Sequence, residues 1–480
     1  MDRAASLPVV PTRLPTNALA LSGVILLGLA LRVWAMLASY PASWNNWDTT
    51  AYLDAAKDGL FDNFFRPAGY PLFLRVLHDI WPEVGFTVGV QHLLGLAAAP
   101  LVYLMGRRLG LSRGLAVVPA AVIALNGDQI ALEHAMLSES LFTPLLVASA
   151  YALVRAADST RPWAWLAAAG AAAAAMVAVR AAALPLLAVM ALGAALLPPV
   201  DLRGALRRAA VAGGVGIGLV LAYAAVAGVV TGHYGVTRGT GWAIYARAAP
   251  FADCQQFAPP KPTRRLCEFN DPEARPGPDF YLWEPGSPAW RSFGAPPTAG
   301  GDVGAFGRSA LLHQPRTYVG YVLSDLWRYV NAGSGRTGHG FGLGPDLLLI
   351  DRRAPDVEQY TAGQVARWYG AEPLRIGSSL STLADVQDAV RFHGALVLLS
   401  AVLILIAAVV GASRTRWAVL VLGALALVVM LTPAATMVYH ARYGVPTDGL
   451  LALGGVLAAA TILERVRRRG VDGTFRRPAS

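Results

Sequence analysis

The sequence predicts an all-α integral membrane protein with about ten transmembrane helices. Of its 480 residues, 55% are hydrophobic and only 15% are charged, whereas soluble domains carry about 25% charged residues. The mean hydropathy is also positive. Apolar runs of about 20 residues, the length of a helix that crosses a bilayer, recur through the chain. The predicted spans are 17–38, 86–105, 115–126, 137–154, 163–179, 181–198, 207–230, 392–411, 417–433 and 445–463.

Arginine is concentrated in alternate short loops between these spans. The clusters lie within 107–113, 155–161, 203–208, 414–416 and 465–469. Because positive loop charge marks the cytoplasmic side, we expect these loops and both chain termini to face the cytoplasm. The net charge of +10 then reflects a place in the inner or plasma membrane, and no nucleic-acid partner is expected. The first apolar run exceeds the 7–15 residues of a signal-peptide core, so it is expected to remain as a span.

The spans divide the chain into three parts. Residues 1–230 form the predicted N-terminal transmembrane catalytic core, and its first outer loop, 39–85, is expected to carry amphipathic helices at the membrane interface. Residues 231–391, rich in proline and glycine over part of their length, are expected to form a small irregular extracytoplasmic domain. Residues 392–480 supply the last spans and a basic cytoplasmic tail.

The only two cysteines of the chain lie in the predicted extracytoplasmic insert. They are Cys254 and Cys267. Disulfides persist outside the cytoplasm, so we expect these residues to form one. Two free thiols are the alternative.

The first outer loop places an acid and an arginine at the membrane surface. Asp48 precedes a predicted amphipathic helix at 49–60, and Arg66 opens the run Arg-Pro-Ala-Gly-Tyr-Pro before a second helix at 70–77. Asp48 would serve as a helix cap, or as a general base that takes the proton of an acceptor hydroxyl. Arg66 would contact lipid headgroups, or bind a lipid phosphate through its planar guanidinium group.

Further polar residues lie at the predicted outer ends of the spans. Glu139 falls within an apolar stretch, where an ionisable residue is a candidate functional group. Arg180 lies between two spans on the outer side, where positive charge is uncommon, so it is a candidate phosphate ligand or headgroup anchor. The other candidate substrate-binding residues are Tyr70, Glu133, His134, His440, Arg442 and Tyr443. An aromatic belt with a snorkelling arginine is the alternative for the last three.

The sequence carries no specific metal-ligand or cofactor signature. A divalent metal held by Asp48, Glu133 and His134 is left open, although their spacing matches no ligand pattern. No other cofactor is expected, because neither a Walker-type loop nor a Rossmann glycine fingerprint occurs.

Four stretches together resemble the polytopic glycosyltransferases of GT-C type that use polyprenyl-phosphate sugar donors. They are 47–53, 66–71, 137–142 and 442–446. This group includes protein O-mannosyltransferases, the lipid A aminoarabinose transferase and bacterial arabinofuranosyltransferases. The resemblance implies that Asp48 is the general base and that arginines hold the donor phosphate. It also implies inversion at the transferred sugar and an extracytoplasmic glycan, lipid or protein acceptor.

The sequence departs from this group in two ways. Several members place two adjacent acidic residues in the first outer loop, where this chain has Asn46 and Trp47 before a single Asp48. The large C-terminal outer domain of some members is missing. These departures leave the acceptor open. The alternative functions are a polysaccharide polymerase or ligase that uses a diphosphate-linked donor, and a transporter or flippase of lipid-linked sugars.

Overall fold

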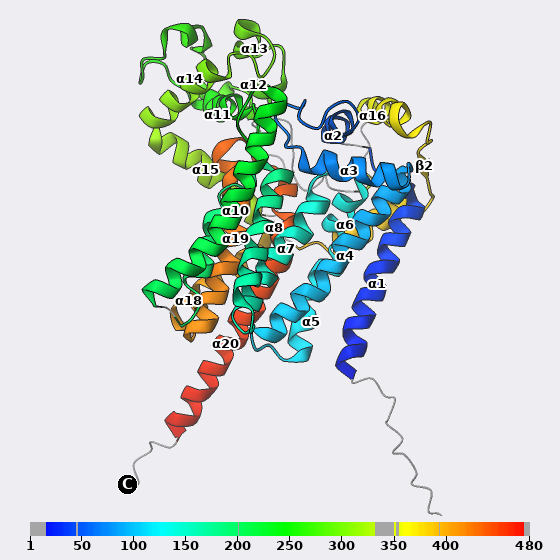
Figure 1. Cartoon of the computed structure of the whole chain (residues 1–480), viewed down its shortest axis with the longest axis vertical. Coiled ribbons are helices and arrows are strands. Elements are labelled where there is room, and N and C mark those ends of the chain that lie inside the picture. Colours follow the sequence, from blue (N-terminus) through cyan, green and yellow to red (C-terminus); the bar gives the residue numbers. More distant parts are fainter. Residues whose placement is uncertain are drawn as a thin grey trace, which may run out of the picture.

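The computed structural model describes residues 16–44, 47–199, 201–331, 350–351, 355–392 and 394–474, except for the side chains of 16–18 and 469–474. Long helices run side by side, and a group of short helices covers one end of this bundle (Figure 1). The only strands among the described residues are β1 (Ser39–Tyr40) and β2 (Arg375–Ile376), which pair antiparallel. The prediction of an all-α, multi-pass membrane protein is confirmed.

Eight helical segments in the described part of the chain are long and apolar enough to cross a membrane. The other two predicted spans, 137–154 and 181–198, correspond to α7 and the shorter α9, which fall outside that set. The bundle helices are α1 (Thr16–Ala38), α4 (Val84–Arg108), α5 (Arg113–Leu125), α6 (Gly127–His134), α7 (Glu139–Ala156), α8 (Pro162–Val179), α9 (Leu186–Ala195), α10 (Leu202–Thr231), α17 (Leu380–Ala389), α18 (Gly394–Val410), α19 (Ser413–Thr436) and α20 (Asp448–Thr474).

The stretch after α5, which separates the predicted spans 115–126 and 137–154 and so was expected to be an outer loop, is helical. The α5 helix ends at Leu125, and the side chain of Asn126 accepts a hydrogen bond from the backbone N–H of Asp128 at 3.1 Å. This bond caps the start of α6, so the chain begins a new helix instead of leaving the bundle. Most of α6 is buried, including its last two residues, Glu133 and His134. The predicted span at 115–126 therefore extends to residue 134 as a broken helix.

Three short helices, two of them within the first loop, lie together at one end of the bundle. They are α2 (Trp47–Lys57), α3 (Gly69–Ile80) and α16 (Pro355–Tyr369), and α16 lies beside α2 (Figure 1). The α3 helix buries Tyr70, Leu74 and Leu77, a spacing that places all three on one face. The two amphipathic helices predicted for the first loop are thus present as α2 and α3.

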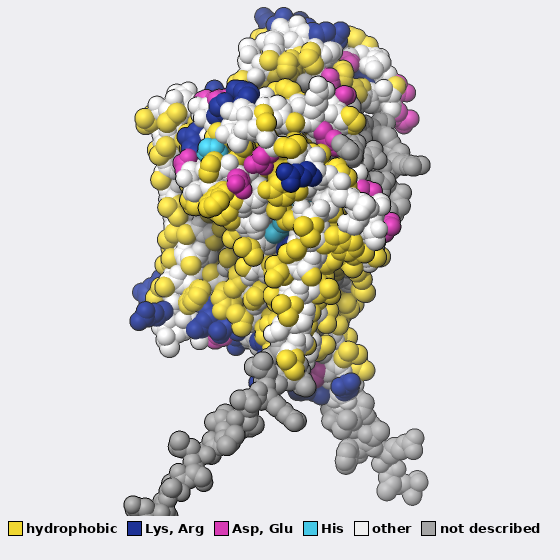
Figure 2. Space-filling model, turned by 90° about the vertical axis from the view of Figure 1, so that its right-hand side faces the viewer, with side chains coloured by type: hydrophobic (Ala, Val, Ile, Leu, Met, Phe, Trp, Pro, Cys, Tyr) yellow, Lys and Arg dark blue, Asp and Glu magenta, His cyan; other side chains and the backbone are white. Residues whose placement is uncertain are grey.

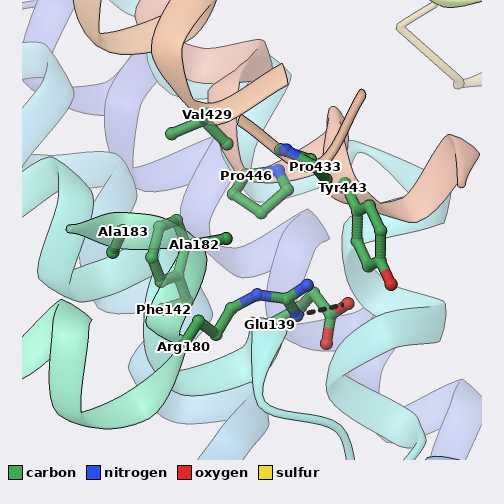
Figure 3. Close-up of a pocket in the computed structure, with 9 residues that line it drawn as sticks. All are labelled: Glu139, Phe142, Arg180, Ala182, Ala183, Val429, Pro433, Tyr443 and Pro446. Carbon is green, nitrogen blue, oxygen red and sulfur yellow. Dashed lines mark ion pairs between the residues drawn. The ribbon is translucent and has the colours of Figure 1, made fainter. Parts of the chain in front are cut away.

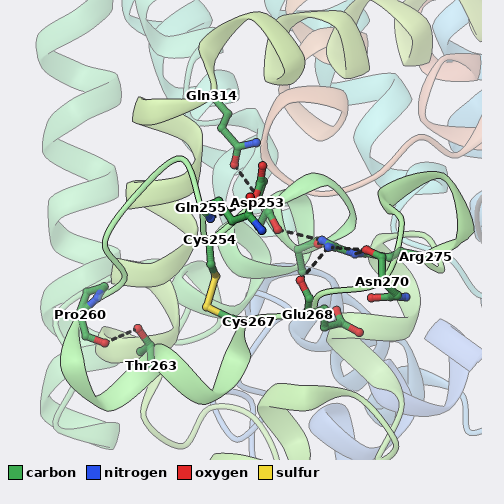
Figure 4. The surroundings of a disulfide bond; sticks show 12 residues. Asp253, Cys254, Gln255, Pro260, Thr263, Cys267, Glu268, Asn270, Arg275 and Gln314 are labelled. Carbon is green, nitrogen blue, oxygen red and sulfur yellow. Dashed lines mark hydrogen bonds between the residues drawn. A yellow bond between two sulfur atoms is a disulfide. The ribbon is translucent and has the colours of Figure 1, made fainter.

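Residues 240–330 form a compact group of helices that we call the cap. Trp242, Tyr245 and Phe306 belong to a hydrophobic cluster of the cap that is separate from the bundle core. Cys254 and Cys267 form a disulfide within it (Figure 4). The cap helices are α11 (Thr240–Ala248), α12 (Pro278–Trp283), α13 (Pro288–Phe293), α14 (Gly300–His313) and α15 (Pro315–Val330), with 3₁₀ turns at Ala249–Phe251, Lys261–Leu266 and Pro272–Ala274.

Arginines gather at the end of the bundle opposite the cap. Arg108, Arg155 and Arg414 lie at the ends of three helices, α4, α7 and α19, each next to one of the arginine-rich loops. All three approach the carboxylate of Asp158, at 2.8, 2.9 and 3.9 Å. Figure 2 shows groups of Lys and Arg side chains below the apolar surface, away from the cap. These loops therefore share one side of the molecule, as their charge predicted. We call this end the basic end.

Candidate active site

The candidate site lies at the cap end of the bundle and begins with Asp48. The α2 helix starts at Trp47, so Asp48 belongs to its first turn and does not precede the helix as predicted. A carboxylate is favoured there, because the amide groups at a helix N-terminus carry partial positive charge. Burial of Tyr52 and Leu53 fixes α2 against the bundle. Asn46 precedes Asp48 in the loop where several similar glycosyltransferases have two adjacent acidic residues. It lies outside the described residues.

The loop that carries Arg66 is held by hydrogen bonds at both ends. The side-chain carbonyl of Asn63 accepts from the backbone N–H groups of Phe65 and Arg66, at 2.9 and 2.8 Å. The backbone N–H of Ala68 donates to the hydroxyl of Tyr223 on α10, at 2.9 Å. The Arg66 side chain therefore projects from a fixed backbone.

Gly69 lets the start of α3 approach the end of α8 closely. A Cβ atom at this position would lie 2.5 Å from the carbonyl oxygen of Ala178, closer than any side chain permits. Glycine, which has no Cβ, fits the contact. The contact brings the segment that carries Arg66 next to the segment that carries Arg180.

Five charged side chains form a continuous chain of ion pairs. Arg66 contacts one carboxylate oxygen of Asp48, and Arg442 contacts the other. Arg442 Nε lies 3.4 Å from Glu139 Oε1, and Arg180 Nη1 lies 2.7 Å from the same oxygen. Side-chain exposure ranges from 1% at Glu139 to 21% at Asp48. The charges are therefore largely shielded from water, which strengthens their interactions.

A small pocket adjoins this chain of ion pairs. Arg180 points toward Glu139 at the polar side of the pocket, and apolar side chains form the opposite wall (Figure 3). The ring of Tyr443 lies between two arginines, 4.7 Å from Arg180 Cζ and 5.3 Å from Arg442 Cζ. The lining residues are Glu139, Phe142, Arg180, Ala182, Ala183, Val429, Pro433, Tyr443 and Pro446. The pocket thus combines cationic and apolar surface.

Aromatic and hydroxyl groups hold the arginines in place. Arg66 Cζ lies 5.6 Å from the ring centroid of Tyr52 and 5.5 Å from that of Trp283, a cap residue on α12. The Tyr52 hydroxyl donates to Ser138 Oγ at 2.8 Å, and Arg180 Nη1 donates to the same oxygen at 3.0 Å. Sequence reasoning identified none of Tyr52, Ser138 and Trp283.

Burial raises the pKa of the Asp48 carboxyl, but the guanidinium groups of Arg66 and Arg442 outweigh burial and hold the pKa well below its usual value. Because the pKa is lowered on folding, the stabilisation from these contacts is present at neutral pH and is lost only in strong acid. While both arginines hold it, Asp48 is a weak base, since a general base works best with a pKa near the operating pH.

Two other predicted residues border the site. The ring of Tyr70 packs edge-on against Tyr52, with centroids 4.7 Å apart. The ring of His440 lies 4.9 Å from that of Tyr443, and His440 Nε2 lies 3.7 Å from a carboxylate oxygen of Asp279 in the cap. The predicted residues that the structure gathers here are Asp48, Arg66, Tyr70, Glu139, Arg180, His440, Arg442 and Tyr443.

Glu133 and His134 belong to a different, fully buried cluster. Arg32 of α1 binds both carboxylate oxygens of Glu133, at 2.8 and 3.0 Å. His92 of α4 lies 3.0 Å from Glu133 and 3.2 Å from His134, which in turn contacts the carbonyl oxygen of Ser39 at 2.6 Å. This network joins α1, α4 and α6 through satisfied polar groups. We therefore interpret it as structural.

Replacing Glu133 by glutamine should destabilise the protein by about 3–5 kcal/mol, because it leaves the buried guanidinium of Arg32 without its counter-charge. Thermal unfolding in detergent measures this change. Glu464→Gln is the matched control, since Glu464 forms an exposed pair with Arg468 that should contribute about 1 kcal/mol or less. Wild-type stability for Glu133→Gln together with lost activity would contradict the structural interpretation and support the substrate-binding role predicted from the sequence.

The described residues do not provide a divalent-metal site. No group of three or more His, Cys, Asp and Glu side chains among them is arranged to hold an ion. Glu133 and His134 are bound within their own network, and both oxygens of Asp48 face arginines. The three residues considered for a metal therefore do not meet.

Part of the chain matches a known protein family. Residues 85–204 match the family model described as dolichyl-phosphate-mannose-protein mannosyltransferase. The matched stretch runs from α4 to the start of α10, so it includes Glu139 and Arg180 but neither Asp48 nor Arg442. For these residues the match confirms the resemblance to membrane glycosyltransferases. No curated protein matches the chain in sequence.

Several solved membrane proteins are distantly similar in structure. The Saccharomyces cerevisiae protein O-mannosyltransferase Pmt1-Pmt2, bound to its sugar donor, is 14% identical over 44% of this chain and 34% of its own, with a TM-score of 0.36. Archaeoglobus fulgidus oligosaccharyltransferase AglB, in complex with an inhibitory peptide and dolichol-phosphate, is 14% identical over 97% and 52%, with a TM-score of 0.44. ArnT from Cupriavidus metallidurans, bound to undecaprenyl phosphate, is 12% identical over 92% and 78%, with a TM-score of 0.36. The chain thus spans only about half or less of the first two relatives, and these similarities are too distant to assign an activity.

Proposed function

We propose that the protein is a membrane glycosyltransferase. It transfers a sugar from a polyprenyl-phosphate donor to a hydroxyl group of a cell-envelope glycan, lipid or protein. The observation that carries this proposal is the chain of ion pairs beside an amphiphilic pocket: Arg180 and Tyr443 line its polar side, and residues such as Phe142 and Val429 its apolar side. A lipid-linked phosphate has the same two parts, an anionic head and an apolar chain.

The charge of the site supports a monophosphate donor. Three guanidinium groups and two carboxylates leave a formal charge of +1 (three minus two). A polyprenyl-phosphate sugar is a phosphodiester with one negative charge, so its binding would neutralise the site. A diphosphate-linked donor would add one charge more than the arginines balance. Arginine suits this task, because its planar fork binds two phosphate oxygens at once.

The position of the site supports an extracytoplasmic reaction. The chain of ion pairs lies at the cap end, and the arginine-rich loops that meet at Asp158 lie at the opposite end. Since positive loops mark the cytoplasmic side, the cap end would face away from the cytoplasm. A bacterial inner membrane or a plasma membrane fits this orientation.

Asp48 would act as the general base in a single displacement. The acceptor hydroxyl oxygen forms a bond to the anomeric carbon while its proton passes to Asp48. The bond from that carbon to the phosphate oxygen breaks, and the polyprenyl phosphate leaves with the electron pair. Arg66, Arg180 and Arg442 would stabilise the charge that develops on this leaving group. Attack opposite the leaving group inverts the anomeric carbon.

The donor test uses purified protein in lipid nanodiscs with a cell-envelope extract as acceptor. Radiolabelled polyprenyl-phosphate hexose and pentose are compared with the matching diphosphate-linked sugars. Transfer of label from monophosphate donors should be at least about 100-fold faster, because uncompensated like charge in a shielded site costs several kcal/mol. Faster use of the diphosphate donors would favour a polymerase or ligase. Redistribution of intact lipid-linked sugar across the membrane, without transfer, would favour a flippase.

A further inference from the structure

In the absence of a donor, the groups that would bind its phosphate are held by the residue that would act as the base. Arg66 takes one oxygen of Asp48 and Arg442 takes the other. Arg180 makes its ion pair with Glu139 instead. Two of the three cations at the site are therefore engaged by a single carboxylate.

These contacts differ in nature from the pair beside them. Glu139 is 1% exposed and faces Arg180 inside the bundle, whereas the Asp48 side chain is 21% exposed and stands at the first turn of a short helix. The Arg442 guanidinium also has a hydrogen-bond donor that is not in use. Its Nη1 atom is buried and has no hydrogen-bond partner among the described residues. A phosphate that displaced the Asp48 carboxylate from Arg442 would thus gain a donor that no described group now uses.

We propose that the phosphate of the donor and the carboxylate of Asp48 compete for Arg66 and Arg442, so that donor binding releases Asp48 to act as the base. This inference rests on the proposed function. Before the donor arrives, Asp48 is neutralised and does not activate an acceptor or water. When the phosphate takes over the two guanidinium groups, the carboxylate regains its basicity beside the bound sugar. The donor would therefore bind first and the acceptor second.

Competition has a consequence that a merely structural Asp48 would not have. Removing its charge should strengthen phosphate binding, because Arg66 and Arg442 no longer have to exchange one anion for another. The same change removes the base, so transfer should fall. Binding and transfer should thus move in opposite directions. A structural carboxylate, by contrast, would weaken both when replaced.

The test measures binding of farnesyl phosphate, a short soluble polyprenyl phosphate, to the purified full-length protein by titration calorimetry at about pH 5, where this phosphate monoester carries about one negative charge, as the donor does. Asp48→Asn and Asp48→Ala should each bind it on the order of 10-fold more tightly than wild type, within the usual range of coupling between two ligands. Asp54→Asn, a change on the same helix at a half-buried position, should bind like wild type. Farnesol, which lacks the phosphate, should show no gain with either Asp48 variant.

Two outcomes separate this inference from the proposed function. If wild type binds farnesyl phosphate and Arg442→Gln loses that binding, the phosphate site exists. Unchanged or weaker binding by both Asp48 variants would then overturn the competition alone. If neither wild type nor the Asp48 variants bind farnesyl phosphate better than farnesol, the phosphate site itself is wrong and the proposed function fails with it. Thermal unfolding of each variant shows whether it remains folded.

Discussion

Replacing Asp48 by asparagine should lower the rate of sugar transfer by about 10²–10⁴-fold, the usual contribution of general base catalysis. Asparagine has nearly the same shape as aspartate but accepts no proton from the acceptor hydroxyl. Both of its partners, Arg66 and Arg442, lie at the same site, so the cationic surface for the donor remains. The loss should therefore appear in kcat, measured as transfer of labelled sugar to the acceptor at saturating donor.

Asp54→Asn is the control for this change. Asp54 lies on the same helix, is 42% exposed and lies 3.8 Å from Arg367 at the surface. Its replacement should leave the transfer rate within about 2-fold of wild type, because exposed pairs contribute little. Wild-type turnover by Asp48→Asn would rule out Asp48 as the base.

Replacing Arg442 by glutamine should reduce kcat by about 10²–10³-fold, the effect of removing one group that stabilises developing negative charge. Arg442 is the central cation of the site, because it contacts Asp48 on one side and Glu139 on the other. Its loss would change the formal charge from +1 to zero. The leaving phosphate would then lack one of its counter-charges. Single-turnover measurements with labelled donor separate this chemical step from donor binding.

The matched control for Arg442→Gln is Arg367→Gln. Arg367 lies on α16, is 51% exposed and faces Asp54 and Asp58. This variant should transfer sugar at nearly the wild-type rate. A similar loss in both variants would mean that the effect follows from the general charge of the cap end and not from the position of Arg442.

The helices of the bundle were predictable from hydropathy, because a backbone in lipid must satisfy its hydrogen bonds within a helix. The predicted spans 163–179 and 392–411 differ from α8 and α18 by at most two residues at either end. The exception is α6. The polar cap residue Asn126 and the helix residues Asp128 and Glu133 suggested a loop, but each has partners inside the protein. Polarity alone does not distinguish such a helix from a loop.

The charged residues of the site were predictable individually, because charge is costly at the membrane and is kept there for a reason. Their pairing was not. Asp48 and Arg442 are 394 positions apart, and no local pattern indicates which acid faces which arginine. The sequence suggested that Glu133 and His134 lie with Asp48, yet they are bound to Arg32 and His92 instead.

Some of the missed residues carried a signal and others did not. Arg32 and His92 lie inside the predicted spans 17–38 and 86–105, where an ionisable residue indicates a buried partner. Tyr52 and Ser138 gave no such indication. A tyrosine on the apolar face of a helix and a serine before one occur in many structural contexts, so only the three-dimensional contacts reveal their part in holding Arg180.

The contact at Gly69 sets a minimum distance between the two segments that carry Arg66 and Arg180, which are proposed to bind the phosphate. Gly69, three residues after Arg66, lies against the carbonyl of Ala178, which is two residues before Arg180. These two segments are already as close as a residue without a Cβ atom allows. Any larger residue at position 69 would push the two segments further apart. Substitution at position 69 can therefore widen the space between Arg66 and Arg180 but cannot narrow it.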